Sequence, residues 1–410
     1  MRKRSSVVVG IDIGTTKICT FVAERVKGAL DIIGIGQYAS LGLRKGVIID
    51  VQKASDSIRE SIIKAEHMAG ISIDSAYVSI GGNHIKGFKS RASVSLRNKE
   101  VSLEDMERVV GEASMVPLGD GREILHIIPQ YFSIDGQAGI RIPLGMAGRR
   151  LEVDTYIITG SSSAVQNVKK CCRLAGLNVT GLVLQPLASS EAVLFDEEKE
   201  LGVVLVDMGG GTSDFMILHE GTLKYVSVLA VGGMHITNDI AVAFKVGNLE
   251  AERLKIEHGC AFADLLQEDE AIEVKLVSNR GDRTITQKSL SKIIEARVEE
   301  ILQVIRKGIK SSNLEGLMAS GLVFVGGSSL LYGIQEFSSE IIGLPPRLGL
   351  PGQRIGGLVD LVRNPSYATG VGLLLYADKC DKKSKHKFKN FNVFMKVLKH
   401  LFLRKNYHEK

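Results

Sequence analysis

Tryptophan is absent from the chain, and proline is scarce, with eight among 410 residues. Glycine, by contrast, occurs 44 times. This composition indicates an α/β protein with many strand–turn junctions rather than a disordered chain. No apolar run reaches the roughly 18 residues that a membrane-spanning helix needs, and the first residues lack the apolar stretch and cleavage site of a secretory signal. We therefore expect the protein to stay in the cytoplasm.

Neither cysteine nor histidine forms a recognisable metal or disulfide pattern. The five cysteines contain no C-x-x-C pair, and the nine histidines show no H-x-x-x-H spacing. An odd number of cysteines without such spacing predicts reduced thiols. A metal site built from side chains alone is therefore not expected.

Positive charge is concentrated in the last part of the chain. Residues 379–410 hold eleven Lys or Arg and two acidic residues, a net charge of +9, although the whole chain carries only +6. The remaining residues therefore carry a net charge of −3. Because this larger part is slightly acidic, it offers no general nucleic-acid surface, and we expect no nucleic-acid partner.

Two glycine-rich turns of the same design lie 195 positions apart. In each, a β-branched run ends in an aspartate, Asp12 or Asp207, and is followed by glycine, threonine and a second apolar run. Glycine lets backbone N–H groups approach phosphate oxygens without a Cβ in the way, and a carboxylate at the strand end can hold a hydrated Mg²⁺. One such turn most often binds nothing, but two in register predict a duplicated nucleotide clamp.

A third glycine motif supports this interpretation. Residues 321–331 combine a buried-type strand, the pair Gly326-Gly327 and then Ser328, which we expect to cap a helix. A helix that begins there would direct its N-terminus toward an anion.

The length of the chain exceeds what one hydrophobic core usually serves, so we expect two lobes. The first would open with three strands within residues 6–38 and a helix at 51–69, which Asp50 can cap and Gly70 can end.

Residues 83–160 interrupt this first lobe and have the pattern of an insert. Their strand patterns, with a helix whose capping box is Ser102 and Asp105, suffice for a small α/β subdomain. In the second lobe, residues 241–313 show mostly helical patterns, with one apolar side along 290–309. The predicted division is a first lobe core at 1–82, 161–200 and 367–378, the insert at 83–160, a second lobe core at 201–240 and 314–366, a helical subdomain at 241–313, a basic linker at 379–390 and an amphipathic helix at 391–405.

Together these motifs resemble the five-part signature of the actin-type ATPase superfamily, at residues 10–18, 181–194, 205–214, 321–331 and 367–375. The resemblance implies an α/β fold in which two duplicated domains close on ATP and Mg²⁺. By position it nominates Gly14, Thr15, Thr16, Lys17, Gly209, Gly210, Gly211, Thr212, Gly232, Gly233, Gly326, Gly327 and Ser328 as nucleotide contacts, Glu252 and Lys255 as adenosine contacts, and Asp12 and Asp207 as Mg²⁺-side carboxylates.

The layout of the chain points to one branch of this superfamily. Actin, MreB and the chaperones insert a subdomain between the third strand and the first helix, where this chain has only residues 41–49. Its insert follows Gly81-Gly82 instead, which is similar to the FtsA family of bacterial division proteins. Residues 232–241 also resemble an FtsA segment, apart from Met234, where a small or polar residue is expected.

The FtsA resemblance implies a function in cell division. It implies ATP as a conformational and assembly ligand, filaments on the cytoplasmic face of the cell membrane at the division site, and an anchor for the ring of the tubulin-like FtsZ, bound through its C-terminal peptide. Later divisome proteins would bind the 83–160 insert. For the FtsZ contact we nominate Arg297, with Lys292 nearby, although an arginine on an amphipathic helix more often lies on a solvated face.

The C-terminal residues have the pattern of an interfacial helix. At about 100° per residue, the apolar side chains form one stripe and most of the polar and basic side chains lie opposite. Such a helix is too short and too basic to span a membrane, but it suits an anionic lipid surface. The alternative is a helix docked on its own domain, which would not need the preceding lysine-rich tether. The nominated membrane residues are Phe391, Phe394, Met395, Lys396, Leu398, Lys399, Leu401 and Phe402.

Gln185 occupies the position of a glutamate in the chaperone ATPases and a glutamine in actin. An amide can orient water but cannot accept its proton, so we expect at most a slow ATPase. Alternatively, Gln185 only satisfies the backbone at a strand end.

Other functions use the same clamp. A sugar kinase needs a catalytic aspartate in the cleft between the lobes, and no residue here matches that motif. A PilM-like pilus assembly scaffold shares the fold and the insert, and it is the nearer alternative. A chaperone function is not expected, since no substrate-binding domain follows in this sequence.

Overall fold

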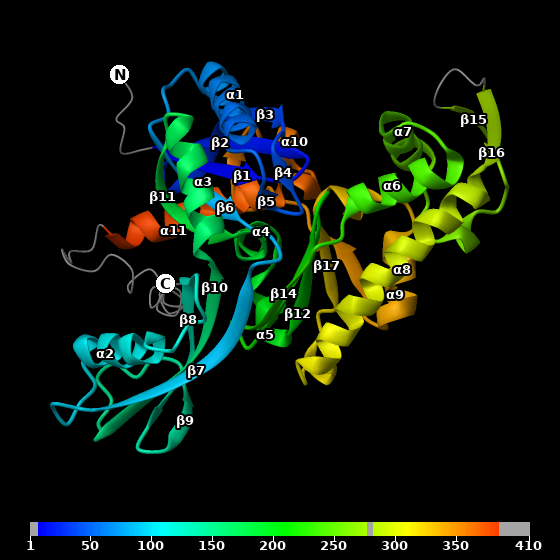
Figure 1. Ribbon diagram of the computed structural model, residues 1–410. Helices are drawn as coiled ribbons and strands as arrows, with labels where there is room; N and C mark the ends of the chain where they lie inside the picture. The colour runs from blue at the N-terminus through cyan, green and yellow to red at the C-terminus, as the bar shows by residue number, and fades with distance from the viewer. Residues whose placement is uncertain (1–6, 277–281, 385–410) are drawn as a thin grey trace.

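Two large sheets with helices on their faces form most of the computed structural model, which describes residues 7–276 and 282–384 (Figure 1). The first sheet contains β1 (Val7–Ile13), β2 (Lys17–Val26), β3 (Ala29–Ala39), β6 (Ser75–Ile80), β11 (Asn178–Leu184) and β19 (Gly356–Gly357). The second contains β12 (Val203–Met208), β13 (Ser213–His219), β14 (Thr222–Leu229), β17 (Leu322–Val325) and β18 (Pro346–Leu348). The strand orders are β11-β6-β1-β2-β3-β19 and β14-β13-β12-β17-β18.

The two sheets repeat one topology around their central strands. β1 pairs antiparallel with β2 and parallel with β6, and β12 pairs antiparallel with β13 and parallel with β17. The two glycine-rich turns are the β1–β2 and β12–β13 connections. The duplication predicted from the sequence is therefore a duplication of strand pairing, which places both turns at equivalent ends of their sheets.

Helices α1 (Val51–Ala69) and α3 (Ser162–Leu174) cover one face of the first sheet. The predicted ends of α1 are confirmed. The side chain of Asp50 accepts a hydrogen bond from the N–H of Lys53, and Gly70 adopts the left-handed conformation, with φ of 67°, while its N–H donates to the carbonyl of Glu66. Glycine adopts this conformation without steric penalty, so the helix ends there.

Helices α4 (Gln185–Val193) and α11 (Ala368–Ser384) lie on the other face of the first sheet and also contact the second lobe. One hydrophobic cluster joins Phe21 of β2, Leu205 of β12 and Leu373 of α11, all fully buried. The two lobes therefore share a core. Helix α5 (Asp196–Leu201) then leads into β12.

The insert forms a separate four-stranded sheet with one helix. Its elements are β7 (Lys86–Ser95), α2 (Leu103–Ser114), β8 (Arg122–Ile134), β9 (Gln137–Ile140) and β10 (Arg150–Ser161), with strand order β7-β10-β8-β9. Met106 and Val110 of α2 pack on Phe132 and Leu151 of the sheet. The predicted capping box is confirmed, since the N–H groups of Ser102 and Asp105 are bound by each other's side chains.

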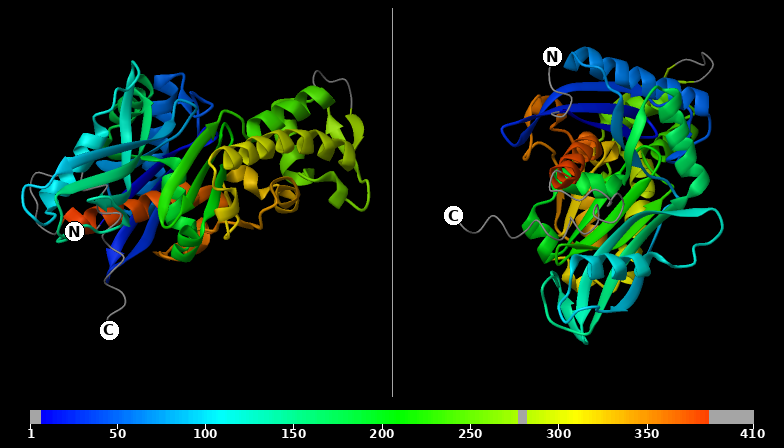
Figure 2. Two further views of the ribbon diagram at one scale, coloured as in Figure 1. Left: turned by 90° about the horizontal axis from the view of Figure 1, so that it is seen from below. Right: turned by 90° about the vertical axis from the view of Figure 1, so that its left-hand side faces the viewer.

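The remaining helices cover the far face of the second sheet, at the opposite end of the molecule from the insert (Figure 2). They are α6 (Gly233–Phe244), α7 (Asn248–His258), α8 (Gln287–Ser311) and α9 (Ile334–Ile342). The apolar side predicted along 290–309 is buried in α8. The mostly helical prediction missed a hairpin, β15 (Ala271–Lys275) and β16 (Asp282–Thr286), in which buried Ile272 and Val274 alternate with exposed residues.

In the described ranges the short elements are β4 (Leu43–Arg44), β5 (Val47–Ile48), α10 (Val359–Val362) and the 3₁₀ turns η2 (Ala263–Leu265), η3 (Glu315–Leu317), η4 (Gly327–Leu330) and η5 (Pro365–Tyr367). Helix α11 runs to Ser384, so the first residues of the predicted basic linker are helical. The predicted amphipathic helix at 391–405 lies outside the described residues. Within the described ranges, no helix is long and apolar enough to cross a membrane.

Candidate functional site

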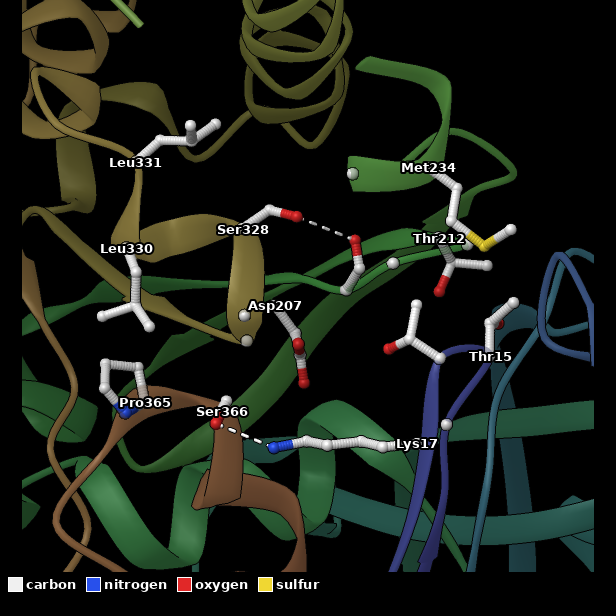
Figure 3. Close-up of a pocket in the computed structure, with 18 of the residues that line it drawn as sticks. Thr15, Lys17, Asp207, Thr212, Met234, Ser328, Leu330, Leu331, Pro365 and Ser366 are labelled. Carbon is white, nitrogen blue, oxygen red and sulfur yellow. Dashed lines mark hydrogen bonds between the residues drawn. The ribbon is translucent and has the colours of Figure 1, made fainter. Parts of the chain in front are cut away.

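A pocket of about 640 Å³ lies between the two glycine-rich turns (Figure 3). Its volume lies within the range of small-molecule and cofactor sites. Most of the residues nominated from the sequence line it. They are Asp12, Gly14, Thr15, Thr16, Lys17, Gln185, Asp207, Gly209, Gly210, Gly211, Thr212, Gly233, Glu252, Lys255, Gly326, Gly327 and Ser328.

The two turns contact each other across the pocket. A Cβ on Gly211 would lie 2.4 Å from Oγ1 of Thr15, and one on Gly210 would lie 2.3 Å from Cγ2 of Thr16. Real Cβ atoms do not approach other atoms this closely, so only glycine fits where the second lobe meets the first. Glycine at these positions leaves the backbone of the second turn without side chains to cover it, as a phosphate-binding turn requires. This arrangement fits a chain of phosphate groups.

Asp12 lies at the floor of the pocket and is 9% exposed. Its Oδ1 accepts hydrogen bonds from Oγ of Ser79 at 2.9 Å and from Nε2 of Gln185 at 3.5 Å. Burial raises the pKa of Asp12, while the Ser79 hydrogen bond and the charge of Lys17 oppose the increase.

Asp207 is held by two hydroxyl groups. Its Oδ2 accepts from Oγ of Ser189 at 3.2 Å and from Oγ1 of Thr369 at 3.3 Å. Burial and the negative charge of Asp12 raise the pKa of Asp207 to about 6. A bound cation would favour the ionised form of this carboxyl group.

Asp214 lies opposite Asp207 in the β12–β13 pair and also lines the pocket. It is 2% exposed, and among the described residues its Oδ1 has no hydrogen-bond partner. Burial raises the pKa of this carboxyl group well above its usual range. Burial therefore favours the neutral, protonated form of Asp214, and a cation bound nearby would favour its ionised form.

The donor set fits Mg²⁺ held together with phosphate. In the described part of the chain, no three His, Cys, Asp or Glu side chains lie close enough to hold a metal by themselves. Mg²⁺ commonly binds through one or two carboxylates plus phosphate oxygens and water. At such a site Asp12 and Asp207 would supply the carboxylate oxygens, and phosphate oxygens and water would complete the shell of the ion.

Lys255 and Glu252 of α7 lie on the second-lobe side of the pocket. Nζ of Lys255 donates to Oγ1 of Thr237 at 2.9 Å, to the carbonyl of Gly233 at 3.3 Å and to Oε2 of Glu252 at 2.7 Å. Nearby apolar lining comes from Ile256, Leu330 and Tyr332. A polar pair beside an apolar wall suits a ribose next to an adenine ring.

Two nominated residues differ from their expected roles. Ser328 does not cap a helix, because it lies inside the short turn η4 and its Oγ donates to the carbonyl of Gly209 at 3.2 Å. Gly232 does not line the pocket. It lies behind the second turn, where a Cβ would be 2.6 Å from the carbonyl oxygen of Gly209. Both residues contact the carbonyl of Gly209 in the second turn.

Gln185 begins α4 at the floor of the pocket. Its Nε2 donates to the carbonyl of Ile13, the last residue of β1, at 3.2 Å. This contact satisfies a strand end, and the residue also lines the pocket. Both interpretations of Gln185 therefore stay open.

The residues nominated for partner and membrane contacts lie elsewhere. Arg297 is on α8, where its Nε donates to Oδ2 of Asp239 at 2.7 Å and its Nη1 contacts Glu300, while Lys292 is exposed on the same helix. Neither lines the pocket. The nominated membrane residues Phe391, Phe394, Met395, Lys396, Leu398, Lys399, Leu401 and Phe402 lie outside the described residues.

Five polar residues that hold or adjoin the nominated side chains were missed from the sequence. Four of them carry hydroxyl groups. Three of these lie on buried faces of a strand or helix, where serine and threonine give no distinct pattern, and Ser366 lies in the 3₁₀ turn η5. Asp214 carried a usable signal, because it ends the same motif as Asp207 in a run that is otherwise apolar. The missed residues are Ser79, Ser189, Asp214, Ser366 and Thr369.

Solved structures of low sequence identity share the fold. The PilM–PilN type IV pilus biogenesis complex contains a chain that matches with a TM-score of 0.66 at 17% identity, covering 90% of this chain and 98% of that one. MreB5 of Spiroplasma citri bound to ADP matches with a TM-score of 0.58 at 13% identity, covering 94% and 100%. These likenesses establish the actin-like fold and nothing more specific.

Sequence comparisons identify the family. The model for "Cell division protein FtsA" matches residues 204–372, and that for "SHS2 domain inserted in FTSA" matches residues 82–159. Cell division protein FtsA of Pseudomonas aeruginosa is 42% identical over 370 residues, 90% of this chain and 88% of that protein. The proteins of Borreliella burgdorferi and Escherichia coli are 40% and 35% identical, over 96% and 90% of this chain and 94% and 90% of theirs. With its actin-like fold and its SHS2 insert, the chain belongs to the FtsA family of cell division proteins.

Proposed function

We propose that this chain is an ATP-binding division protein that polymerises on the cytoplasmic face of the cell membrane at the division site. There it anchors the FtsZ ring through the FtsZ C-terminal peptide and helps to recruit later divisome proteins through the 83–160 insert. Family membership supports the division function. The observation that carries nucleotide binding is the meeting of two glycine-rich turns across one pocket, with Gly211 against Thr15.

In this proposal the two turns bind the phosphate groups through backbone N–H groups and Lys17. Asp12 and Asp207 hold Mg²⁺, which neutralises phosphate charge when bound. Glu252 and Lys255 contact the ribose, and Gly326 to Ser328 lie along the adenosine. Closure of the lobes on ATP then sets a filament-competent shape. The same actin-like layout with Gln185 at the floor supports at most slow hydrolysis, since an amide orients water without accepting its proton.

Asp207→Ala tests the nucleotide site. Loss of this carboxylate should abolish Mg²⁺-dependent ATP binding, measured by isothermal titration or by a fluorescent ATP analogue. Thermal unfolding of the variant serves as the folding control. Unchanged affinity in a folded variant would show that the nucleotide binds elsewhere.

The FtsZ contact is proposed for the α8 surface around Arg297 and Lys292. Arg297 is 27% exposed and paired with Asp239, so charge reversal also breaks that pair. Arg297→Glu should weaken binding of the FtsZ C-terminal peptide in a fluorescence anisotropy assay. Two controls separate the causes: Asp239→Asn breaks the same pair but keeps the arginine, and Lys310→Glu reverses an exposed charge elsewhere on α8. Equal losses in Arg297→Glu and Asp239→Asn would assign the effect to the pair rather than to peptide contact.

Membrane attachment is proposed for residues 391–405, with the basic residues before and within them drawn to anionic lipid. Deletion of 391–410 should remove co-sedimentation with vesicles that contain anionic lipid. Retained co-sedimentation would favour the alternative helix docked on its own domain.

A PilM-like pilus scaffold is the second candidate, supported only by the shared fold. The two candidates differ in their partner. A pull-down with the FtsZ C-terminal peptide should capture this chain if the division function is right, whereas a pilus scaffold would not bind it.

A further inference from the structure

Residues 365–369, here called the closing segment, contact all three nucleotide motifs within five positions. The carbonyl of Pro365 accepts a hydrogen bond from the N–H of Gly326 at 3.1 Å. Oγ of Ser366 accepts a hydrogen bond from Lys17, and Oγ1 of Thr369 donates one to Asp207. The segment therefore connects the first turn, the strand that leads into the second turn, and the adenosine motif; Figure 3 shows its hydrogen bond to Lys17.

Lys17 is held by this segment rather than by a carboxylate. Its Nζ donates to Oγ of Ser366 at 2.9 Å and lies 3.9 Å from the ring centroid of Tyr367. Among the described residues it forms no ion pair. An ammonium group has three N–H donors, so two stay available for an acceptor in the pocket that Lys17 lines.

The two residues that hold Lys17 are themselves fixed. The hydroxyl of Tyr367 donates to Oε1 of Gln37 at 2.9 Å, and its ring meets Phe21 edge-on with centroids 5.8 Å apart. The N–H of Ser366 donates to Oδ1 of Asn364 at 2.9 Å. A flexible lysine therefore lies against a rigid surface made by the closing segment.

We propose that Ser366 and Tyr367 are positioning residues that hold the Lys17 ammonium at the place where a nucleotide phosphate binds. This inference rests on the proposed nucleotide-binding function. The aromatic face attracts the cation without neutralising it, and the hydroxyl takes one donor. The Lys17 side chain is thus already restricted to few rotamers before a ligand binds. Nucleotide binding therefore does not bear the entropy cost of fixing this side chain.

The test measures the affinities of the full-length protein for ATP, ADP and adenosine. Tyr367→Leu and Ser366→Ala should each lower affinity for ATP and ADP by about three- to tenfold, the size expected for a partly buried cation–π or hydrogen-bond contact. Affinity for adenosine, which has no phosphate, should not change. Ser366→Thr and Tyr367→Phe keep the hydroxyl and the ring that contact Lys17, and they should retain wild-type affinity.

Tyr38→Leu is the matched control. Lys64 lies 5.0 Å from the Tyr38 ring on the same lobe, away from the pocket lining. Removing that ring should leave all three affinities unchanged. A loss of the same size in Tyr38→Leu would reduce the Tyr367 result to general destabilisation and would overturn the inference.

A double-mutant cycle with Lys17→Met decides whether the effect passes through the lysine. In the Lys17→Met background, Tyr367→Leu and Ser366→Ala should have no further effect on ATP affinity. Additive losses, or an equal loss of adenosine affinity, would contradict a positioning role. Wild-type protein that binds ATP while the variants match it would overturn this inference alone, whereas wild-type protein that binds no ATP would overturn the proposed function as well.

Discussion

The first turn, Gly14–Lys17, and the second, Gly209–Thr212, close with the same hydrogen bond but offer a ligand different chemistry. In the first, the N–H of Gly14 donates to the carbonyl of Lys17 at 3.1 Å, and in the second the N–H of Gly209 donates to the carbonyl of Thr212 at 2.9 Å. The first turn carries two threonines and a lysine, whereas the second is mostly bare backbone.

The carboxylates below the turns differ in the same way. Asp12 shares its surroundings with Lys17, which opposes the increase in its pKa. Asp207 has Asp214 beside it and hydroxyl partners. The first turn and its surroundings therefore supply hydroxyl groups and the Lys17 ammonium, and the second turn and its surroundings supply close backbone approach and two buried carboxyl groups. Duplicated topology has given two complementary halves of one site.

The largest expected effect comes from filling the contact between the turns. Gly211→Ala would place a Cβ within 2.8 Å of three atoms of Thr15, so rotation of the threonine cannot relieve the clash. The turns must separate, and we expect ATP affinity to fall by about tenfold or more, as for other overpacked contacts. Titration calorimetry measures the loss. Wild-type affinity in this variant would mean that the turns already lie apart when nucleotide is bound.

The next prediction concerns the titration of Asp207. Asp207, with a pKa of about 6, must be ionised to hold Mg²⁺, so Mg²⁺-ATP affinity should be about tenfold lower at pH 5 than at pH 7. The raised pKa also means that the folded protein binds this proton more tightly than the unfolded chain. Its contribution to stability is thus present at low pH and is lost as pH rises through 6.

Asp207→Asn isolates that titration. The variant should equal the wild type in stability only below about pH 3.8, begin to exceed it as pH rises toward 6, and exceed it fully at pH 7 to 8, measured by urea denaturation without ligand. If the stability of Asp207→Asn depended on pH as that of the wild type does, the titrating group would be a residue other than Asp207.

Two serine-to-alanine substitutions compare how much the hydroxyl partners of Asp12 and of Asp207 contribute to stability. Ser79→Ala removes a donor to Asp12 and leaves the N–H of Ile13, which bonds Oγ of Ser79 at 2.9 Å, without that acceptor. We expect a loss of about 1–3 kcal/mol. Ser189→Ala should cost less, about 0.5–1.5 kcal/mol, because Thr369 still donates to Asp207. Denaturant unfolding of both variants measures the two losses in the free energy of unfolding. A larger loss in Ser189→Ala than in Ser79→Ala would contradict this prediction.

The smallest expected effect is that of Gly209→Ala, which tests the backbone of the second turn against that of the first. A Cβ on Gly209 would lie 3.2 Å from the carbonyl oxygen of Thr212, whereas one on Gly14 would lie 2.8 Å from that of Lys17. Gly209→Ala should therefore change stability by only about 0.5 kcal/mol, and Gly14→Ala by about 1–3 kcal/mol. Thermal melts of the two variants measure the difference, which would vanish if the turns were equivalent.

The sequence predicted helix ends well where a side chain caps the backbone of its own helix. Asp50 and Gly70 fixed the ends of α1, and Ser102 with Asp105 fixed the start of α2, because caps depend on neighbouring residues alone. The β15–β16 hairpin was missed because its short alternating runs lie among longer helical patterns.

In the candidate site, the motif residues were brought together as expected from the duplicated turns, but their supports were not foreseen. Ser189 and Thr369 reach Asp207 from helices 18 and 162 positions away in the sequence, and such contacts follow from packing rather than from local pattern. The expected capping role of Ser328 was wrong, because the 3₁₀ turn η4 begins at Gly327 and Ser328 lies inside it.

The position of α4 and α11 between the two sheets has a consequence for how the molecule melts. These helices contribute side chains to one apolar cluster that also includes Phe21 and Leu205 from different sheets. Neither half can lose its structure without exposing the surface of the other, so calorimetry should record one cooperative heat-absorption peak for both halves. Within the insert, the cluster around Phe132 can melt separately, whereas Tyr156 and Ile158 of β10 belong to the shared cluster.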